Sequence, residues 1–267
     1  NLLSTDNLIA LIVISVLFGI AVNKSGEKGT KVAELLESFS EVMYKLIGII
    51  MYYAPVGLGC YFASLIGTIG NVMAVGFLKT FIVYLIVSLL FMVIFYSLYA
   101  FIAAKKRGIK AFWKNIVPSA LTALGTCSSA ASVPVNIECT KKIGVPNDIA
   151  ETTVSLGTSF HKDGSSIGSV FKIMFLVSLF GTSIDSFSDI SFILGVALIA
   201  TLLVTAVPIG GGTISEMLII TMLNYPIEAL PILTIIATII DAPATLLNVT
   251  GDCACAMLVT RSVEGKN

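Results

Sequence analysis

Long apolar stretches separated by short polar breaks make up most of the chain. The clearest stretch covers residues 77–104 and carries one charged side chain, Lys79, near its start. About 20 apolar residues suffice to cross the hydrocarbon core of a bilayer as a helix. This stretch is longer, so we expect a tilted transmembrane helix. The same pattern along the chain predicts an all-α integral membrane protein.

Four further helical segments follow from the apolar pattern. Residues 8–22 are short for a full crossing and predict the closing piece of a broken span. Residues 30–67 begin with glutamates at helical spacing and then become apolar, which predicts a helix that enters the bilayer from its surface. A broken span is expected at residues 147–181, and a last span at residues 227–259.

Residues 111–143 have two apolar arms too short to span and a small, polar middle around Ser128 and Ser129. This pattern is typical of a re-entrant helical hairpin, whose exposed backbone is tolerated only beside a cavity. We expect Ser128 and Ser129 at the tip. The alternative is a kinked crossing helix in which small residues serve helix packing.

Residues 190–223 repeat this pattern. Their middle contains Pro208 and three successive glycines, Gly210, Gly211 and Gly212. Glycine permits close approach of the backbone to a ligand, at a cost of about 1 kcal/mol each in a helix, so we expect a movable gate. A kinked helix is again the alternative. Two such segments favour paired half-helices that meet at the bilayer midplane.

The last span carries a polar stripe. Asp241, Thr245, Asn248 and Asp252 fall within one narrow face of a helix, and the other faces are apolar. A carboxylate deep in a bilayer costs about 2.5–3.5 kcal/mol on insertion scales, so both acids should face protein or a water-filled cavity. The stripe predicts a track for a cation and an ammonium group. The alternative is two carboxylates satisfied by hydrogen bonds near the helix ends.

The expected broken span contains the run His161-Lys162-Asp163-Gly164-Ser165. Three consecutive ionisable residues followed by glycine and serine predict an unwound bend. His161 is the only histidine. A lone histidine is more often a satisfied buried group than a metal ligand, and in a membrane core a proton-relay role stays open.

Composition and charge narrow the function. The chain is 56% hydrophobic and 12% charged, whereas soluble domains are about 25% charged. The net charge is zero, and no basic run alternates with aromatic residues, which argues against nucleic-acid binding. The five cysteines are interpreted as small core residues. Short loops rich in lysine and arginine stay in the cytoplasm. The strongest such cluster is Lys105, Lys106, Arg107, Lys110 and Lys114.

The order of these segments resembles the dicarboxylate/amino acid:cation symporter family, which has the fold of the excitatory amino-acid transporters. The best match is the run at residues 248–252, Asn-Val-Thr-Gly-Asp, with Asp241 and Thr245 before it. The resemblance covers essentially the whole chain but begins inside the family's fourth span, so we expect a part of a longer protein. It implies scaffold-type helices in residues 1–72, a transport domain in residues 73–267 and a homotrimer.

The resemblance also implies roles for individual residues. The substrate would contact Ser128, Ser129, Ser165, Gly211, Asp241, Thr245 and Asn248, with Asp241 on its ammonium group. A sodium ion would be held by Gly157, His161, Asp163, Asn248 and Asp252. The extracellular gate would consist of Pro208, Gly210, Gly211 and Gly212.

The chain departs from the family pattern in two places. Lys162 stands where the family has a methionine. Like charges repel by about 4 kcal/mol at about 4 Å with an effective dielectric constant of about 20, so that sodium site is lost, or Lys162 is neutral, or it points away. The positions where acidic-substrate members carry arginine are Thr126 and Ala244. An unpaired buried carboxylate is costly, which favours a small neutral amino acid as substrate.

We therefore expect a multi-pass cell-membrane protein that is a secondary active transporter, not an enzyme. It would carry a small neutral amino acid together with Na+ or H+ by alternating access, in contact with membrane lipid and with no other cofactor. The first alternative is an acidic amino acid or C4-dicarboxylate paired with Lys162, and the second is an ion channel. A membrane-embedded hydrolase is disfavoured because Ser128 lacks the glycine-flanked turn of such nucleophiles.

Overall fold

The computed structural model describes residues 8–53, 71–202 and 212–265, together with residues 56, 60, 67 and 204. Within these residues the regular elements are helices and no strand occurs, so the predicted all-α fold is confirmed. Among them, three helical segments are long and apolar enough to cross a membrane: Val75–Asn115, Asn147–Phe180 and Ile227–Glu264. The chain divides into two compact units, Asn1–Leu58 and Gly59–Asn267.

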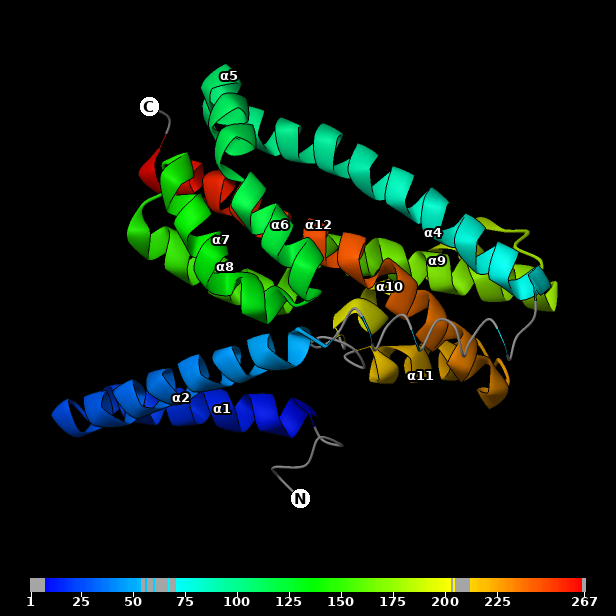
Figure 1. The fold of residues 1–267 in the computed structure, drawn as a ribbon, viewed down its shortest axis with the longest axis horizontal. Helices are drawn as coiled ribbons and strands as arrows, with labels where there is room; N and C mark the ends of the chain where they lie inside the picture. The colour runs from blue at the N-terminus through cyan, green and yellow to red at the C-terminus, as the bar shows by residue number, and fades with distance from the viewer. Residues whose placement is uncertain are drawn as a thin grey trace. The chain divides into compact units, whose positions relative to one another are not determined.

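The first unit contains α1 (Leu8–Lys24) and α2 (Glu27–Met51), which pack against each other (Figure 1). Gly26 in the turn between them has a φ of +57°, a conformation that favours glycine. Gly29 meets the backbone carbonyl of Val22 so closely that a Cβ there would have no room. Glycine at position 29 therefore lets the start of α2 lie close to the end of α1. The second half of the helix expected at residues 30–67 falls largely outside the described residues.

The second unit begins with one long run formed by α4 (Asn71–Phe91), the π-helical turn η2 (Met92–Tyr96) and α5 (Ser97–Asn115). Much of its outer surface is apolar and exposed, as at Leu78, Ile82, Ile86, Leu90 and Ile94. Such a surface suits lipid rather than water. α5 bends sharply at Ala104 and Lys105, whose backbone is not helical. The bend coincides with the first residue of the basic cluster.

A helical hairpin follows, with arms α6 (Val117–Thr126) and α7 (Ser129–Ile143). Cys127 ends α6 in the left-handed conformation, with φ of +48°, and Ser128 is extended. The Ser128 Oγ accepts a hydrogen bond from the Ala131 N–H, which caps α7. The tip is therefore a two-residue turn at Cys127 and Ser128.

The next pair is α8 (Asn147–Phe160) and α9 (Asp163–Phe180). Only His161 and Lys162 are non-helical between them, so the interruption is shorter than the unwound bend expected from the polar run. Asp163 stands in the first turn of α9, where a carboxylate interacts favourably with the helix dipole.

The second pair of short arms is α10 (Phe187–Leu202) and α11 (Thr213–Met222), which pack against each other. Three of the four expected gate residues, Pro208, Gly210 and Gly211, lie outside the described residues. Gly212 is described and immediately precedes α11.

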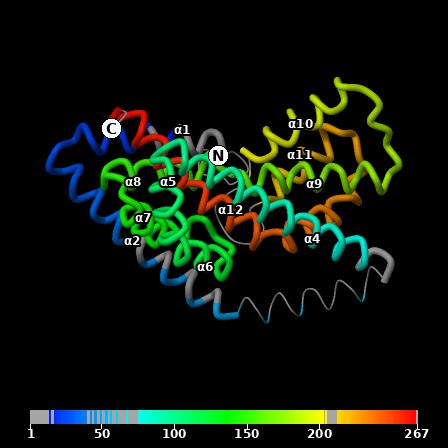
Figure 2. Tube along the Cα trace, turned by 90° about the horizontal axis from the view of Figure 1, so that it is seen from above, coloured from blue at the N-terminus to red at the C-terminus, as the bar shows by residue number. Residues whose placement is uncertain are grey.

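The last helix is the centre of the second unit. After the short helix η3 (Ile227–Ala229), α12 runs from Leu230 to Glu264 without a break at Pro243. It packs against α4, α5, α6, α7, α8, α9 and α11, and Figures 1 and 2 show it running along and between these helices. Its middle part, from Pro243 to Ala254, is buried throughout. Thr245, Asn248 and Asp252 of the predicted polar stripe thus face protein, whereas Asp241 is partly exposed.

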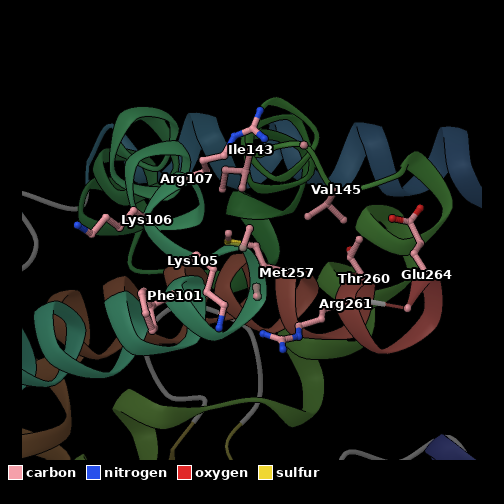
Figure 3. Close-up of a pocket in the computed structure, with 14 residues that line it drawn as sticks. Phe101, Lys105, Lys106, Arg107, Ile143, Val145, Met257, Thr260, Arg261 and Glu264 are labelled. Carbon is pink, nitrogen blue, oxygen red and sulfur yellow. The ribbon is translucent and has the colours of Figure 1, made fainter. Parts of the chain in front are cut away.

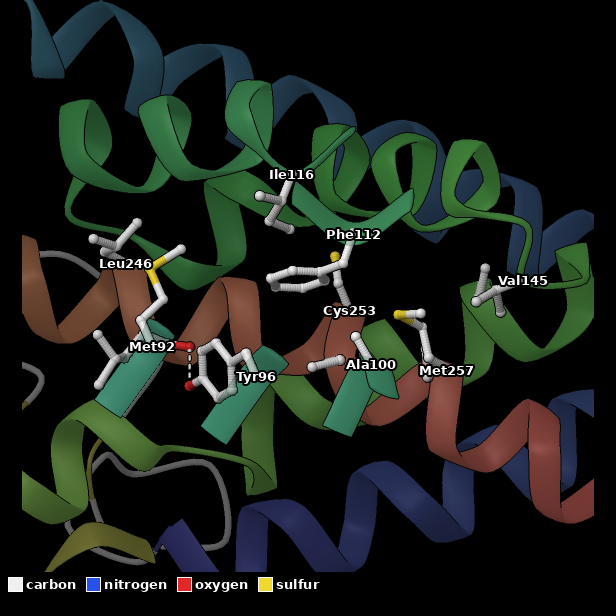
Figure 4. Packing of buried hydrophobic residues seen from close by; sticks show 13 residues of the cluster. Met92, Tyr96, Ala100, Phe112, Ile116, Val145, Leu246, Cys253 and Met257 are labelled. Carbon is white, nitrogen blue, oxygen red and sulfur yellow. Dashed lines mark hydrogen bonds between the residues drawn. The ribbon is translucent and has the colours of Figure 1, made fainter. Parts of the chain in front are cut away.

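An apolar cluster holds α12 to its neighbours (Figure 4). Tyr96 of η2, Phe112 of α5, Ile116 beside α6 and Leu247 of α12 are each at most 1% exposed. Between membrane helices, such contacts stabilise through close van der Waals packing rather than through removal of apolar surface from water. The cluster fixes α12 against the α5–α6 corner and so positions the polar residues that follow on α12.

Candidate functional site

Asn248 of α12 joins the last helix to the break between α8 and α9. Its Oδ1 accepts hydrogen bonds from the backbone N–H groups of Gly164 at 2.9 Å and Ser165 at 3.3 Å. Its Nδ2 donates to the Ser165 Oγ at 3.0 Å. The first N–H groups of a helix have no partner within the helix, so a buried α9 start needs an outside acceptor. Asn248 supplies it.

The backbones of α9 and α12 touch at the same place. A Cβ on Gly164 would overlap the backbone of Ala244, so only glycine fits there. This close approach brings the start of α9 within reach of the Asn248 side chain. The expected substrate residues Ser165 and Asn248 are therefore in direct contact.

His161 lies between two carboxylates. Its Nε2 is 3.3 Å from the Asp163 Oδ2, and its Nδ1 is 3.2 Å from the Asp252 Oδ1. Asp252 is 1% exposed, and its Oδ1 and the His161 Nδ1 do not meet in hydrogen-bond geometry. Asp252 also approaches Gly157 so closely that a Cβ on Gly157 would collide with the carboxylate. Four of the five residues expected at a sodium site thus form one cluster.

Tyr84 and Tyr96 hydrogen-bond to this region of α9 and α12. On a regular α-helix two side chains twelve positions apart would diverge by about 120°. The π-helical turn η2 accommodates one extra residue, so the two tyrosines come within about 20° of one face. The Tyr84 hydroxyl donates to the Gly164 carbonyl at 2.8 Å. The Tyr96 hydroxyl lies 3.0 Å from the Asp163 Oδ2 and 2.8 Å from the Leu247 carbonyl oxygen.

The first residue of the polar stripe, Asp241, is less buried than the other three. Asp241 is partly exposed, and the Thr245 Oγ1 lies 3.5 Å from its Oδ1. Both arms of the first hairpin, α6 and α7, pack against α12. Ser128 and Ser129 are 1% and 7% exposed at the tip of this hairpin. The first hairpin therefore lies against the helix that carries the stripe.

The first hairpin is anchored to α12 by a polar contact that the sequence did not predict. Asn136 of α7 donates from its Nδ2 to the Val249 carbonyl at 2.8 Å and accepts at its Oδ1 from the Ser119 hydroxyl at 2.6 Å. All three groups are buried. There was little signal for this contact in the sequence, because α7 also contains serine, threonine, glutamate and lysine residues.

Lys162 does not point at the cation-site cluster. Its Nζ donates a hydrogen bond to the Val204 carbonyl, just beyond the C-terminal end of α10. The C-terminal end of a helix is the favourable end for a cation. Lys162 thereby links the helix break to the first arm of the second hairpin.

A buried ion pair also escaped the sequence analysis. The Lys172 Nζ of α9 lies 3.9 Å from the Glu216 Oε1 of α11, and both side chains are almost fully buried. The Glu216 Oε2 accepts a hydrogen bond from the Thr234 hydroxyl of α12 at 2.7 Å. Glu216 also stands close to Gly212, where the second hairpin enters α11. The sequence did contain a signal for this pair, because charged residues inside apolar membrane segments usually pair with one another or have a function.

Within the described part of the chain, no group of three His, Cys, Asp or Glu side chains has the arrangement of a metal site. A sodium ion would therefore depend on backbone and amide oxygens as well as on carboxylates. The side-chain oxygen of Asn248 is engaged by the start of α9, so its contribution would come from its carbonyl.

These features define a class of protein: an integral membrane protein in which a helix break contacts a largely buried polar stripe and a helical hairpin packs against the helix that carries it. The chain belongs to the sodium:dicarboxylate symporter family, whose family model matches residues 1–262. The resemblance seen in the sequence is confirmed. Because this is a family of symporters, the hydrolase interpretation is set aside.

Individual relatives agree with this assignment. Neutral amino acid transporter B(0) of Rattus norvegicus is 27% identical over 261 residues, which cover 97% of this chain and 46% of the relative. The protein of the same name in Homo sapiens is 28% identical over 264 residues, 97% of this chain and 48% of the relative. Excitatory amino acid transporter 2 of Mus musculus is 28% identical over 249 residues, 92% of this chain and 43% of the relative. The chain thus spans about half the length of these relatives.

Proposed function

We propose that the protein is a secondary active transporter of the cell membrane that moves a small amino acid together with a cation by alternating access. The observation that carries the proposal is the contact of Asn248 with Gly164 and Ser165. This contact ties the polar stripe of α12 to a helix break deep in the apolar unit. Broken helices that surround a polar site are typical of secondary transporters. Family membership and the names of the relatives support the same activity.

For the substrate, we propose that Asp241 takes the ammonium group and that hydroxyl and amide groups orient the rest. The contacts would come from Ser128, Ser129, Ser165, Gly211, Thr245 and Asn248. Thr126 and Ala244 offer no charge to an acidic side chain. The Lys162 ammonium is bound by the Val204 carbonyl, which leaves it less available as a partner for a carboxylate. A small neutral amino acid is therefore favoured over an acidic amino acid or a C4-dicarboxylate.

For the coupling cation, we propose a site at Asp252. Its Oδ1 is buried and accepts no hydrogen bond from the described residues, so a cation would satisfy it. A sodium ion would use this oxygen with backbone oxygens near Gly157 and Asn248, next to His161 and Asp163. The alternative is a proton carried by His161, which is favoured by the position of its ring between two carboxylates.

We further propose that residues 73–267 move as the transport domain and that residues 1–72 belong to the scaffold. The gate would be the second hairpin tip with Pro208, Gly210, Gly211 and Gly212. A homotrimer is the assembly that the family resemblance implies. Cross-linking of the purified protein in detergent, followed by mass measurement, tests the assembly independently of transport.

Uptake into liposomes tests the function. The reconstituted protein is given radiolabelled serine, aspartate or succinate under an inward sodium gradient, an inward proton gradient or neither. We expect saturable serine uptake driven by one of the two gradients. Asp241→Asn should abolish uptake, whereas Asp148→Asn, which alters an exposed acid at the start of α8, should not. Undiminished uptake by Asp241→Asn would reject the ammonium role, and conductance without saturable uptake would indicate a channel.

A further inference from the structure

A cavity of about 1070 Å³ lies at the end of the second unit where the basic cluster begins. Its walls come from three places: the bend in α5, the turn between α7 and α8, and the C-terminal end of α12 (Figure 3). It is separate from the cluster around Asp252. None of the residues assigned to substrate or coupling cation lines it.

The charge of this pocket is strongly one-sided. Its lining includes Lys105, Lys106, Arg107 and Arg261 against a single acid, Glu264. Within the described residues none of the four cations has a carboxylate at salt-bridge distance. Like charges gathered around one cavity repel each other unless an anion lies between them.

Lys105 and Arg261 both line the pocket and lie on the same side of it in the view of Figure 3. Figure 3 shows the Arg261 guanidinium extending toward the side of the pocket where the Lys105 ammonium lies, whereas Lys106 and Arg107 point elsewhere. The bend in α5 places Lys105 there. The φ of Lys105 is +55°, a value that residues with side chains rarely adopt. Its Nζ also lies 5.4 Å from the centre of the Phe101 ring. An unfavourable backbone conformation is thus maintained at a residue that adds charge to the pocket.

Most of the remaining side chains that line the pocket are apolar. Phe101, Ile143, Val145 and Met257 supply hydrocarbon surface beside the cations. A soluble anion would not use this surface, whereas a phospholipid presents a phosphate next to hydrocarbon. The pocket also lies at the end of an apolar span, where the basic cluster predicts the cytoplasmic side. Basic pockets between membrane helices on that side recognise anionic headgroups.

We propose that this pocket binds the phosphate of an anionic phospholipid of the cytoplasmic leaflet, with Lys105 and Arg261 as its direct ligands. The apolar wall takes the first part of the acyl chains. Such a lipid holds the α5 bend to the end of α12, two segments that are far apart in the sequence. The binding site is independent of the proposed transport activity.

The lipid preference of the unaltered protein is the first test. The protein purified in a mild detergent is titrated with phosphatidylglycerol, with phosphatidylcholine of the same acyl chains, with glycerol 3-phosphate and with inorganic phosphate. Thermal stability and lipid adducts in native mass spectrometry are the measurements. We expect phosphatidylglycerol alone to bind and stabilise, more weakly at high salt. Equal effects of phosphatidylcholine, or of either soluble phosphate, would overturn the proposal.

Matched variants give the second test. One basic residue near an anionic lipid contributes about fivefold to binding, so Lys105→Gln with Arg261→Gln should weaken phosphatidylglycerol binding about 25-fold. Lys110→Gln with Lys114→Gln removes the same charge from the same stretch but outside the pocket, and should change binding less than about twofold. An equal loss in both variants would mean diffuse attraction and would overturn the site. If the first pair fails to fold, Arg261→Gln alone should show the fivefold loss.

Discussion

The buried pair Lys172 and Glu216 provides the sharpest test of the packing. Glu216→Met removes one charge and leaves the Lys172 ammonium without its partner at 3.9 Å. With an effective dielectric constant of about 20, that interaction is worth about 4 kcal/mol. Breaking a buried pair on one side costs about 3–5 kcal/mol, because the remaining charge stays desolvated. We therefore expect Glu216→Met to destabilise the protein by about 3–4 kcal/mol.

Removing both charges should cost far less. In Lys172→Met with Glu216→Met neither charge of this pair is left, and such replacements are often neutral. The Thr234 hydroxyl loses Glu216 as acceptor but also lies 3.1 Å from the Leu230 carbonyl, so it keeps a partner. The second substitution should thus recover most of the stability lost in the first.

Thermal unfolding in detergent, followed by the fluorescence of Trp113, the only tryptophan, measures these differences. For a chain of this size about 1 kcal/mol corresponds to about 2–4 °C, so Glu216→Met should lower Tm by about 6–16 °C. The double variant should return to within a few degrees of the unaltered protein. A double variant as unstable as Glu216→Met, or less stable, would refute the inference that the two charges stabilise each other.

Two further predictions concern the cation site and a helix start. Gly157→Ala should abolish cation-driven uptake, because its Cβ would displace the carboxylate of Asp252, whereas Gly195→Ala, which meets open space, should transport normally. Equal uptake by both variants would place the coupling site elsewhere. At the start of α10, outside the spans, hydrogen bonds from Ser186 lower the pKa of the Asp189 carboxyl. The folded state therefore binds its proton less tightly than the unfolded state does. The contribution of this cap is present above the unfolded pKa and is lost as the pH falls through the lower folded pKa. Amide exchange at Ser186 should accelerate over that range, and an Asp189→Ala variant that exchanges with unchanged pH dependence would contradict the assignment.

The sequence by itself determined the helical segments and the main places where they are interrupted. Apolar length and local breaks are properties of neighbouring residues, so they can be read without knowing which helices meet. The turn at Cys127 and Ser128 and the break at His161 and Lys162 lie within polar runs that stood out in the sequence. The polar face of α12 followed from helical spacing alone.

Only the tertiary structure decided the partners. The family resemblance grouped His161, Asp163 and Asp252, but the residue pattern alone did not place the histidine between the two carboxylates, nor did it join Lys172 to Glu216. Such contacts depend on how the helices pack. The π-helical turn that aligns two tyrosines has no hydrophobic signature either. A buried polar group has no water to bond with, so it pairs with the polar group that packing brings close to it. That packing is set across the whole unit.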